Sequence, residues 1–289
     1  MKATSDDSAL VEEIVRRVLE RMGGSPATAP SERLRDETVT ALQPSRNPAA
    51  LERIVAATPA RLGVGRCGTR YLTPVYLRLR ADHAIAKDAV YSELPEGFAN
   101  AMQCVALRTC AADRETFLLR PDEGRRLHPE ARALLVSEGT PGADVQIILG
   151  DGLSAWALER NAPELVPAME REITARGMTV GRRLVVHRSR IAVADEIGVV
   201  LGAKSTVILV GERPGLGTGD SLSAYIAYGP RIDQDNAEKN CVSNIRPLGM
   251  SAQAAARQVA NILARAFATG HGGVAASVSR GAGEGRRSP

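Results

Sequence analysis

The chain has 289 residues, of which 44% are hydrophobic, 24% charged and 3% aromatic. This composition can fill an apolar core in one large domain or two ordinary ones, which excludes a disordered chain and a disulfide-stapled miniprotein. The 37 Lys and Arg residues exceed the 33 Asp and Glu residues by four. Because the few aromatic residues do not accompany clustered basic residues, we predict no nucleic-acid partner.

The four cysteines include no CxxC pair, which is typical of a protein in a reducing compartment. No apolar run approaches the roughly 18–20 residues of a membrane span, and the N-terminus lacks the apolar region of a signal peptide. The four histidines are scattered and none pairs with another ligand at metal spacing. We therefore predict a cytoplasmic protein with no membrane partner and no bound metal.

An amphipathic helix is predicted at residues 8–22, within an N-terminal region that covers residues 1–47. Its apolar stripe consists of Leu10, Val11, Ile14, Val15, Val18, Leu19 and Met22. Gly23-Gly24 ends the helix, and the segment that follows has the composition of a flexible linker. Two interpretations stay open, because so short a helix rarely persists alone: the stripe folds back onto the body of the protein, or it docks onto another molecule.

Residues 48–142 are predicted to form a mostly helical region. Thr73-Pro74 is a suitable N-cap and N1 pair for a helix that extends to Lys87. The preceding loop, 61–70, contains three glycines and three arginines. These residue types can cradle an anion, whereas a surface turn with solvated arginines accounts for the same pattern.

From residue 143 onward, short β-branched runs alternate with helical stretches. Strands are predicted at 145–149, 183–187 and 206–210, and helices at 163–176, 193–201 and 251–267. This alternation predicts an α/β fold, namely a Rossmann-like parallel sheet with helical crossovers, over residues 143–270. The helical region and the N-terminal helix on its linker precede the sheet, and residues 271–289 are expected to form a disordered tail.

The motifs of self-sufficient enzymes are absent. Gly215, Gly217 and Gly219 do not have the GxGxxG spacing, and Ala203 precedes Lys204 where a P-loop requires glycine. The sequence contains no GxSxG elbow and no local Cys–His dyad, so we predict no catalytic residue in this chain. A self-contained nucleotide- or phosphate-using enzyme is a competing hypothesis, which catalysis by the purified chain alone would support.

Ligands of open α/β sheets bind outside the carboxyl ends of the strands, where loops 150–154, 188–191 and 211–217 are predicted here. Glu212 directly follows a buried strand, so its carboxylate can accept hydrogen bonds from a ligand, and the glycines beside it allow a flat molecule to approach. Cys241 can pack beside such a ligand as a small, soft residue. The alternatives are a helix cap or ion pair for Glu212 and a buried core thiol for Cys241.

At these residues the chain resembles the small (light) subunit of ethanolamine ammonia-lyase. The matching motifs follow one another in family order between about residues 60 and 250: Arg66-Cys-Gly-Thr-Arg70, then 81–90, 120–127, 144–148 and 151–154, then Leu209-Val-Gly-Glu-Arg-Pro-Gly-Leu-Gly217, 220–225 and 241–245. The string from Val210 to Gly217 is highly specific.

The resemblance implies an adenosylcobalamin-dependent lyase that converts ethanolamine and related vicinal amino alcohols to acetaldehyde and ammonia, in ethanolamine degradation. It implies a large subunit, a TIM barrel that carries the substrate and the radical chemistry, in an assembly of six large and six small subunits. The small subunit helps to hold the cofactor and is active only with the large one. The cofactor is base-on, which agrees with the missing DxHxxG motif.

The cobalamin contacts of the family fall on Ile191, Glu212 and Cys241 in this sequence. Isoleucine replaces the valine that the resemblance leads us to expect at position 191, a change that a main-chain contact would survive. Residues 151–154 are expected to line the same pocket.

Three further segments are expected to bind protein partners. Loop 61–70 and the segment 120–126 are expected to meet the large subunit. In organisms that build ethanolamine microcompartments, helices like residues 8–22 address the enzyme to the shell, which predicts a microcompartment location if this organism has one. The competing hypothesis is a non-catalytic microcompartment adaptor or scaffold, whose function deletion of 8–22 would abolish.

Overall fold

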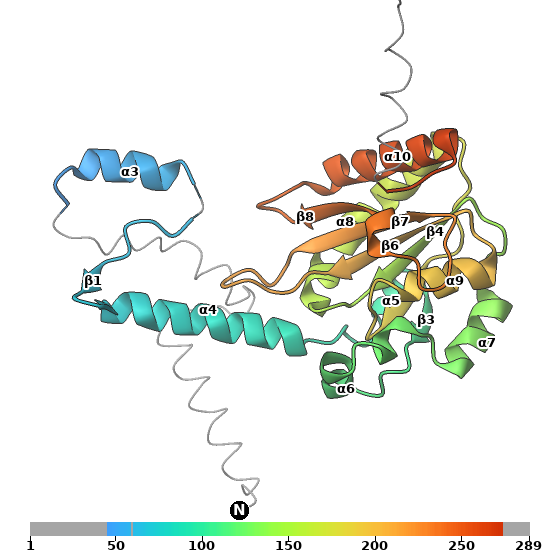
Figure 1. Ribbon diagram of the computed structural model, residues 1–289, viewed down its shortest axis with the longest axis horizontal. Helices are drawn as coiled ribbons and strands as arrows, with labels where there is room; N and C mark the ends of the chain where they lie inside the picture. Colours follow the sequence, from blue (N-terminus) through green and yellow to red (C-terminus); the bar gives the residue numbers. More distant parts are fainter. Residues whose placement is uncertain (1–44, 59, 274–289) are drawn as a thin grey trace, which may run out of the picture. The chain divides into compact units, whose positions relative to one another are not determined.

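The computed structural model describes residues 45–58 and 60–273, which divide into two units at residues 81 and 82 (Figure 1). The first contains helix α3 (Pro48–Ala56), the antiparallel strands β1 (Arg66–Cys67) and β2 (Arg70–Tyr71), and the start of α4 (Thr73–Tyr91). Helix α4 begins at Thr73, one residue before the predicted first helical position, Pro74, and continues past Lys87 to Tyr91. The predicted helix at 8–22 and residues 274–289 of the predicted disordered tail lie outside the described residues. Residues 271–273 of that tail are described, and the Gly273 N–H donates a hydrogen bond to Asn240 Oδ1 at 2.9 Å, so the tail was predicted to start too early.

The second unit is built on a six-stranded sheet in the order β3-β5-β4-β6-β7-β8. Its strands are β3 (Val105–Arg108), β4 (Val145–Gly150), β5 (Leu184–His187), β6 (Ser205–Gly211), β7 (Leu222–Tyr228) and β8 (Asn240–Ile245). The first four strands run parallel to one another, whereas β7 pairs antiparallel with both β6 and β8. The structure is therefore α/β with a mixed sheet.

The prediction of a purely parallel sheet is wrong for β7 and β8. No crossover helix follows β6: the chain turns back, and Gly211 lies opposite Leu222 in the antiparallel register. Strand β3 also went unpredicted, because it is only four residues long and alternates buried and exposed positions. It lies within the region expected to be mostly helical and pairs with β5 at the edge of the sheet.

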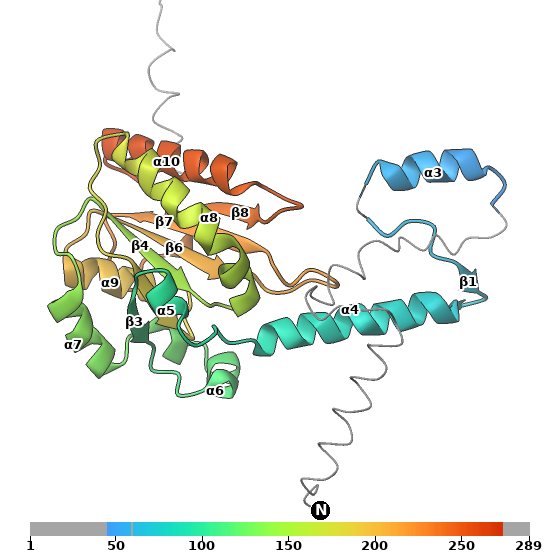
Figure 2. The ribbon, with the colours of Figure 1, turned by 180° about the vertical axis from the view of Figure 1, so that it is seen from behind.

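Helices cover both faces of the sheet (Figures 1 and 2). Helices α8 (Ala155–Thr174) and α10 (Ala252–Thr269) pack on one face, and α7 (Pro129–Glu138) and α9 (Val193–Leu201) on the other. The remaining short helices are α5 (Phe98–Ala101), α6 (Arg114–Leu119), η1 (Glu123–Arg125) and η2 (Asn236–Glu238). The predicted helices at 193–201 and 251–267 are confirmed.

The helix predicted at 163–176 starts eight residues earlier than expected, at Ala155, and contains Pro163 and Pro167 in its interior. An internal proline removes a backbone hydrogen bond and usually ends a helix. Here ten residues of α8 are buried along its length, so packing against the sheet and α10 keeps the helix continuous across both prolines.

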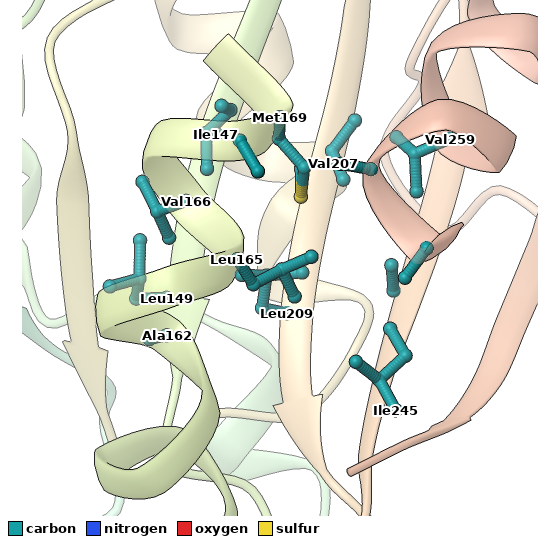
Figure 3. Packing of buried hydrophobic residues seen from close by; sticks show 14 of the residues in the cluster. Ile147, Leu149, Ala162, Leu165, Val166, Met169, Val207, Leu209, Ile245 and Val259 are labelled. Atoms are coloured by element: carbon teal, nitrogen blue, oxygen red, sulfur yellow. The ribbon is translucent and has the colours of Figure 1, made fainter. Parts of the chain in front are cut away.

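The larger apolar core lies between the sheet and helices α8 and α10 (Figure 3). Ile147 and Leu149 of β4 belong to this core, whereas Ile148 belongs to the smaller core beneath α7 and α9. Successive residues of a strand point to opposite faces, so a strand covered on both sides is apolar throughout. This is why the run at 145–149 predicts a strand correctly.

Candidate functional site

A cavity of about 580 Å³ lies at the carboxyl edge of the parallel strands. The loops after β4, β5 and β6 line it, together with β7 and residues 233–236. Its volume falls within the roughly 300–1,000 Å³ of ordinary ligand sites. The edge is also where open α/β sheets bind their ligands. The cavity is therefore the candidate functional site of the second unit.

Ile191 and Glu212 both line this cavity, from the loops that follow β5 and β6. Cys241 does not line it. It is an exposed residue of β8, and in the register of the sheet it lies opposite Tyr225 of β7. Tyr225 does line the cavity, and its side chain is hydrogen-bonded to the Cys241 thiol. The structure thus brings two of the three predicted residues together and places the third one strand away.

Two hydrogen bonds orient the carboxylate of Glu212. The hydroxyl of Ser223 donates to Oε1 at 2.7 Å, and the backbone N–H of Asn244 donates to the same oxygen at 2.9 Å. Within the described residues, Oε2 accepts no hydrogen bond, and Glu212 neither caps a helix nor forms an ion pair. A fixed carboxylate with one unused oxygen beside a cavity can accept a hydrogen bond from a ligand N–H or O–H group.

Cys241 and Tyr225 lie opposite each other on β8 and β7, and Ser223, on the same strand as Tyr225, donates a hydrogen bond to Glu212. Partial burial raises the pKa of the Cys241 thiol, whereas the neighbouring Tyr225 and Ser223 side chains lower it. Burial, with the neighbouring Cys241, raises the pKa of Tyr225 to about 12. Both groups are therefore neutral near pH 7 and offer a ligand a hydroxyl and a polarisable sulfur rather than a charge.

The loop after β4 holds the loop after β5 in place, and part of it also lines the cavity. Asp151 is buried, and its carboxylate accepts hydrogen bonds from the backbone N–H groups of Arg188 at 2.8 Å and Ser189 at 3.0 Å. These bonds fix the loop that carries Ile191. Of the predicted stretch 151–154, only Gly152 and Leu153 line the cavity.

Glycine is required where the loops after β4 and β6 meet. Gly152 has a φ of +58°, and a Cβ there would collide with Val210. A Cβ at Gly211 would collide with the backbone carbonyl of Ser154. These two glycines therefore allow the loops to contact each other. Gly211 also lines the cavity, and the approach of a flat ligand to the glycines beside Glu212 stays a prediction.

The segment 120–126, which we expected to meet the large subunit, reaches the cavity through Pro121 and Arg125. Its Gly124 carbonyl accepts a hydrogen bond from the Arg190 backbone N–H at 2.7 Å. Burial lowers the pKa of the Arg190 guanidinium, with a further contribution from nearby arginines that include Arg125. This part of the cavity lining therefore contributes two guanidinium groups, those of Arg125 and Arg190.

Sequence reasoning missed Tyr225, Ser223 and Arg125 as residues of the site. Ser223 and Tyr225 are two positions apart on β7, so they share one face of the strand. This spacing of two residues, within the motif 220–225, is the sequence pattern that could have indicated them. It could not be interpreted without knowing that β7 returns antiparallel along β6.

The described residues contain no group of three or more His, Cys, Asp or Glu side chains that could hold a metal ion. Among the helices that the structure describes, none is both long and apolar enough to cross a membrane.

Comparison with known proteins gives consistent matches. A family model described as the ethanolamine ammonia-lyase light chain matches residues 48–276, a span that contains all the cavity-lining residues. The chain is 40% identical over 208 residues to the ethanolamine ammonia-lyase small subunit of Clostridium perfringens, covering 72% of this chain and 70% of that one. The small subunit of Rhodopseudomonas palustris is 41% identical over 225 residues, covering 75% and 86%. That of Clostridioides difficile is 42% identical over 208 residues, covering 72% and 71%.

Proposed function

The chain belongs to the ethanolamine ammonia-lyase small-subunit family, and on that premise we propose that it holds one side of an adenosylcobalamin cofactor. The family makes it a subunit of an ammonia-lyase, a carbon–nitrogen lyase, with a large subunit as its partner. The observation that carries the proposal is the cavity whose wall contains both Ile191 and Glu212.

The residues of the cavity fit part of such a cofactor. Cobalamin carries amide side chains around its ring, and the Oε2 oxygen of Glu212 is placed to accept a hydrogen bond from an amide N–H group. A cavity of about 580 Å³ suits a drug-sized ligand and is too small to enclose a corrinoid with its nucleotide. We therefore expect this chain to cover one part of the cofactor and the large subunit to cover the rest.

Each residue of the site has a proposed role. Glu212 accepts a hydrogen bond from an amide of the cofactor, and Ile191 contacts the cofactor through its main chain and its aliphatic side chain. Cys241 and Tyr225 pack beside the cofactor and exclude water. When bound, adenosylcobalamin supplies the radical that begins the conversion of ethanolamine to acetaldehyde and ammonia. This chain positions the cofactor and contributes no catalytic residue, and the cofactor is base-on.

Further parts of the proposal concern assembly and location. We propose an assembly of six large and six small subunits, with loop 61–70 at the large-subunit interface. A cytoplasmic location, within a microcompartment where the organism builds one, is proposed through a shell-binding helix at 8–22. A Rossmann-like relationship is proposed for the parallel part of the sheet, since β4, β5 and β6 are joined by the crossover helices α8 and α9.

The test is co-expression with the large subunit, followed by an assay of ammonia release from ethanolamine with and without adenosylcobalamin. We expect activity only when both chains and the cofactor are present. Activity of the complex without added or co-purified cobalamin would contradict the cofactor assignment. Activity of the small subunit alone would favour the self-contained enzyme instead.

A further inference from the structure

A buried ion pair lies directly behind one wall of the cavity. The Nζ atom of Lys239 is 2.8 Å from Oδ2 of Asp195, and the two side chains are 2% and 0% exposed. Lysine and aspartate are almost never buried to this degree unless they are paired. Lys239 lies between η2 and β8, and Asp195 lies in the first turn of α9.

The pair connects two segments that line the cavity from different parts of the chain. Besides Asp195, Nζ of Lys239 contacts the Gln234 carbonyl oxygen at 3.3 Å and Asn236 Oδ1 at 3.2 Å. Gln234 and Asn236 belong to the cavity wall 233–236. Asp195 lies in the helix that begins immediately after the other wall segment, residues 189–192. One ammonium group thus joins both walls.

Stability alone does not account for this arrangement. Removing two charges from water is costly, and apolar residues of similar volume often stabilise a core as well or better. Burial raises the pKa of the Asp195 carboxyl, even though Lys239 lowers it. Within the described residues, Oδ1 of Asp195 has no hydrogen-bond partner. The pair therefore carries an energetic cost that a purely structural contact could avoid.

The other ion pairs of this wall are exposed. Asp233 pairs with Arg126 across side chains that are 74% and 39% exposed, and Arg231 pairs with Glu238 across side chains that are 63% and 48% exposed. Exposed pairs contribute little to holding a segment in place. The buried ammonium of Lys239 is accordingly the strongest polar restraint among the ion pairs of this wall.

We propose that the Lys239–Asp195 pair is a positioning device that fixes the wall 233–236 against the segment 189–192 and thereby sets the affinity of the cavity for its ligand. The identity of that ligand, cobalamin, rests on the function proposed above, whereas the ordering of the wall does not. An apolar pair could fill the same space but could not hold the Gln234 carbonyl and the Asn236 side chain.

The test compares Lys239→Met with the double variant Lys239→Met/Asp195→Leu. The single variant leaves Asp195 buried without its partner and should unfold at a lower temperature, whereas the double variant removes both charges and should recover the wild-type melting temperature. The proposal predicts that affinity does not recover with stability. In the complex with the large subunit, the double variant should bind adenosylcobalamin about tenfold more weakly than the wild type, because only a fraction of its molecules have an ordered wall. A matched control is Lys204→Met, which breaks the 2.8 Å pair with Asp144, where the lysine side chain is 62% exposed.

A second measurement follows the wall without the cofactor. The backbone N–H groups of Gln234, Glu238 and Lys239 donate hydrogen bonds to carbonyls within this segment, so hydrogen exchange in the full-length chain reports its order. We expect faster exchange there in the double variant and unchanged exchange in β4 and β6.

The outcomes separate the two proposals. The positioning role would be overturned if the double variant had the melting temperature, the cobalamin affinity and the hydrogen exchange of the wild type. If the wild-type complex binds no cobalamin, the proposed function fails while hydrogen exchange still decides about the wall. Should the double variant not fold, hydrogen exchange of Lys239→Met below its melting temperature follows the wall without the ammonium group that contacts it, and unchanged exchange at 233–236 in that variant would equally refute the proposal.

Discussion

The apolar core beneath α8 and the cavity at the carboxyl edge are built on the same strands by different means. In the core, neighbouring residues of continuous elements supply the contacts, as where Leu165 of α8 packs among residues of β4 and β6 (Figure 3). In the cavity, each wall comes from a different loop, and the contacts are hydrogen bonds such as those that orient Glu212. The difference implies that stability and ligand binding can be changed separately.

The largest effect on stability without an effect on binding is expected from Leu165→Ala. Leu165 is fully buried, so the change creates a cavity in the core and should lower the free energy of unfolding by about 2–5 kcal/mol. Chemical denaturation of the full chain measures this loss. Leu119→Ala, at a leucine that is 73% exposed, is the matched control and should change stability little. A weaker affinity for cobalamin in the folded Leu165→Ala protein would show that core and cavity are not separable.

Gly152→Ala should affect both regions, because Gly152 lies where the loops after β4 and β6 meet. The positive φ costs about 1 kcal/mol, and the collision of the new methyl group with Val210 adds about 1–3 kcal/mol. Gly142→Ala is the matched control, since Gly142 has a φ of +70° but no atom within 4 Å of the place that a Cβ would take. Equal losses of stability in the two variants would show that backbone strain, and not the contact between loops, requires glycine at position 152.

Glu212→Ala should weaken cobalamin binding, and it should also lower stability somewhat, because the Ser223 hydroxyl and the Asn244 N–H lose their shared acceptor. We expect the affinity of the assembled complex for cobalamin to fall by about 1–3 kcal/mol, because a cofactor amide is left without its acceptor. Glu212→Gln keeps an oxygen for the hydrogen bonds from Ser223 and Asn244 but places an NH2 group where Oε2 faces the cofactor, so it should preserve stability and still weaken binding. Titration of both variants with adenosylcobalamin measures the difference, and the KM for ethanolamine should stay near its wild-type value. An unchanged dissociation constant in Glu212→Ala would remove this residue from the site.

The same comparison explains which features could be predicted from the sequence. Strands β4, β5 and β6 are buried on both faces, so their apolar runs identify them without knowledge of the rest of the fold. Strands β3 and β8 lie at the edges of the sheet and include exposed positions, so they lack such a run. Their pairing depends on contacts between distant parts of the chain.

The residues of the site also divide into those that a local pattern indicates and those that depend on contacts between distant parts of the chain. Glu212 was identified because it directly follows a buried strand and lies in a specific family motif. Tyr225 was missed because its position beside Glu212 depends on the antiparallel return of β7. The Lys239–Asp195 pair joins residues 44 positions apart in the chain, and no local pattern could indicate that they meet.

The smallest expected effect concerns Asp144, at the opposite edge of the sheet from the cavity. Hydrogen bonds from Lys204 and Thr179 lower the pKa of the Asp144 carboxyl to about 2. Its pKa in the unfolded chain is about 3.9, so the ionised group stabilises the fold above about pH 4, and this contribution is lost as the pH falls toward 2. The free energy of unfolding of Asp144→Asn should therefore be lower than that of the wild type at neutral pH and converge with it in acid.

Glu164→Gln, at an exposed position of α8, is the control. A difference between wild type and Asp144→Asn that persists unchanged down to pH 2 would mean that the contribution of Asp144 is not electrostatic. Because Asp144 precedes β4 and the cavity follows it, cobalamin affinity at neutral pH should be the same in both proteins.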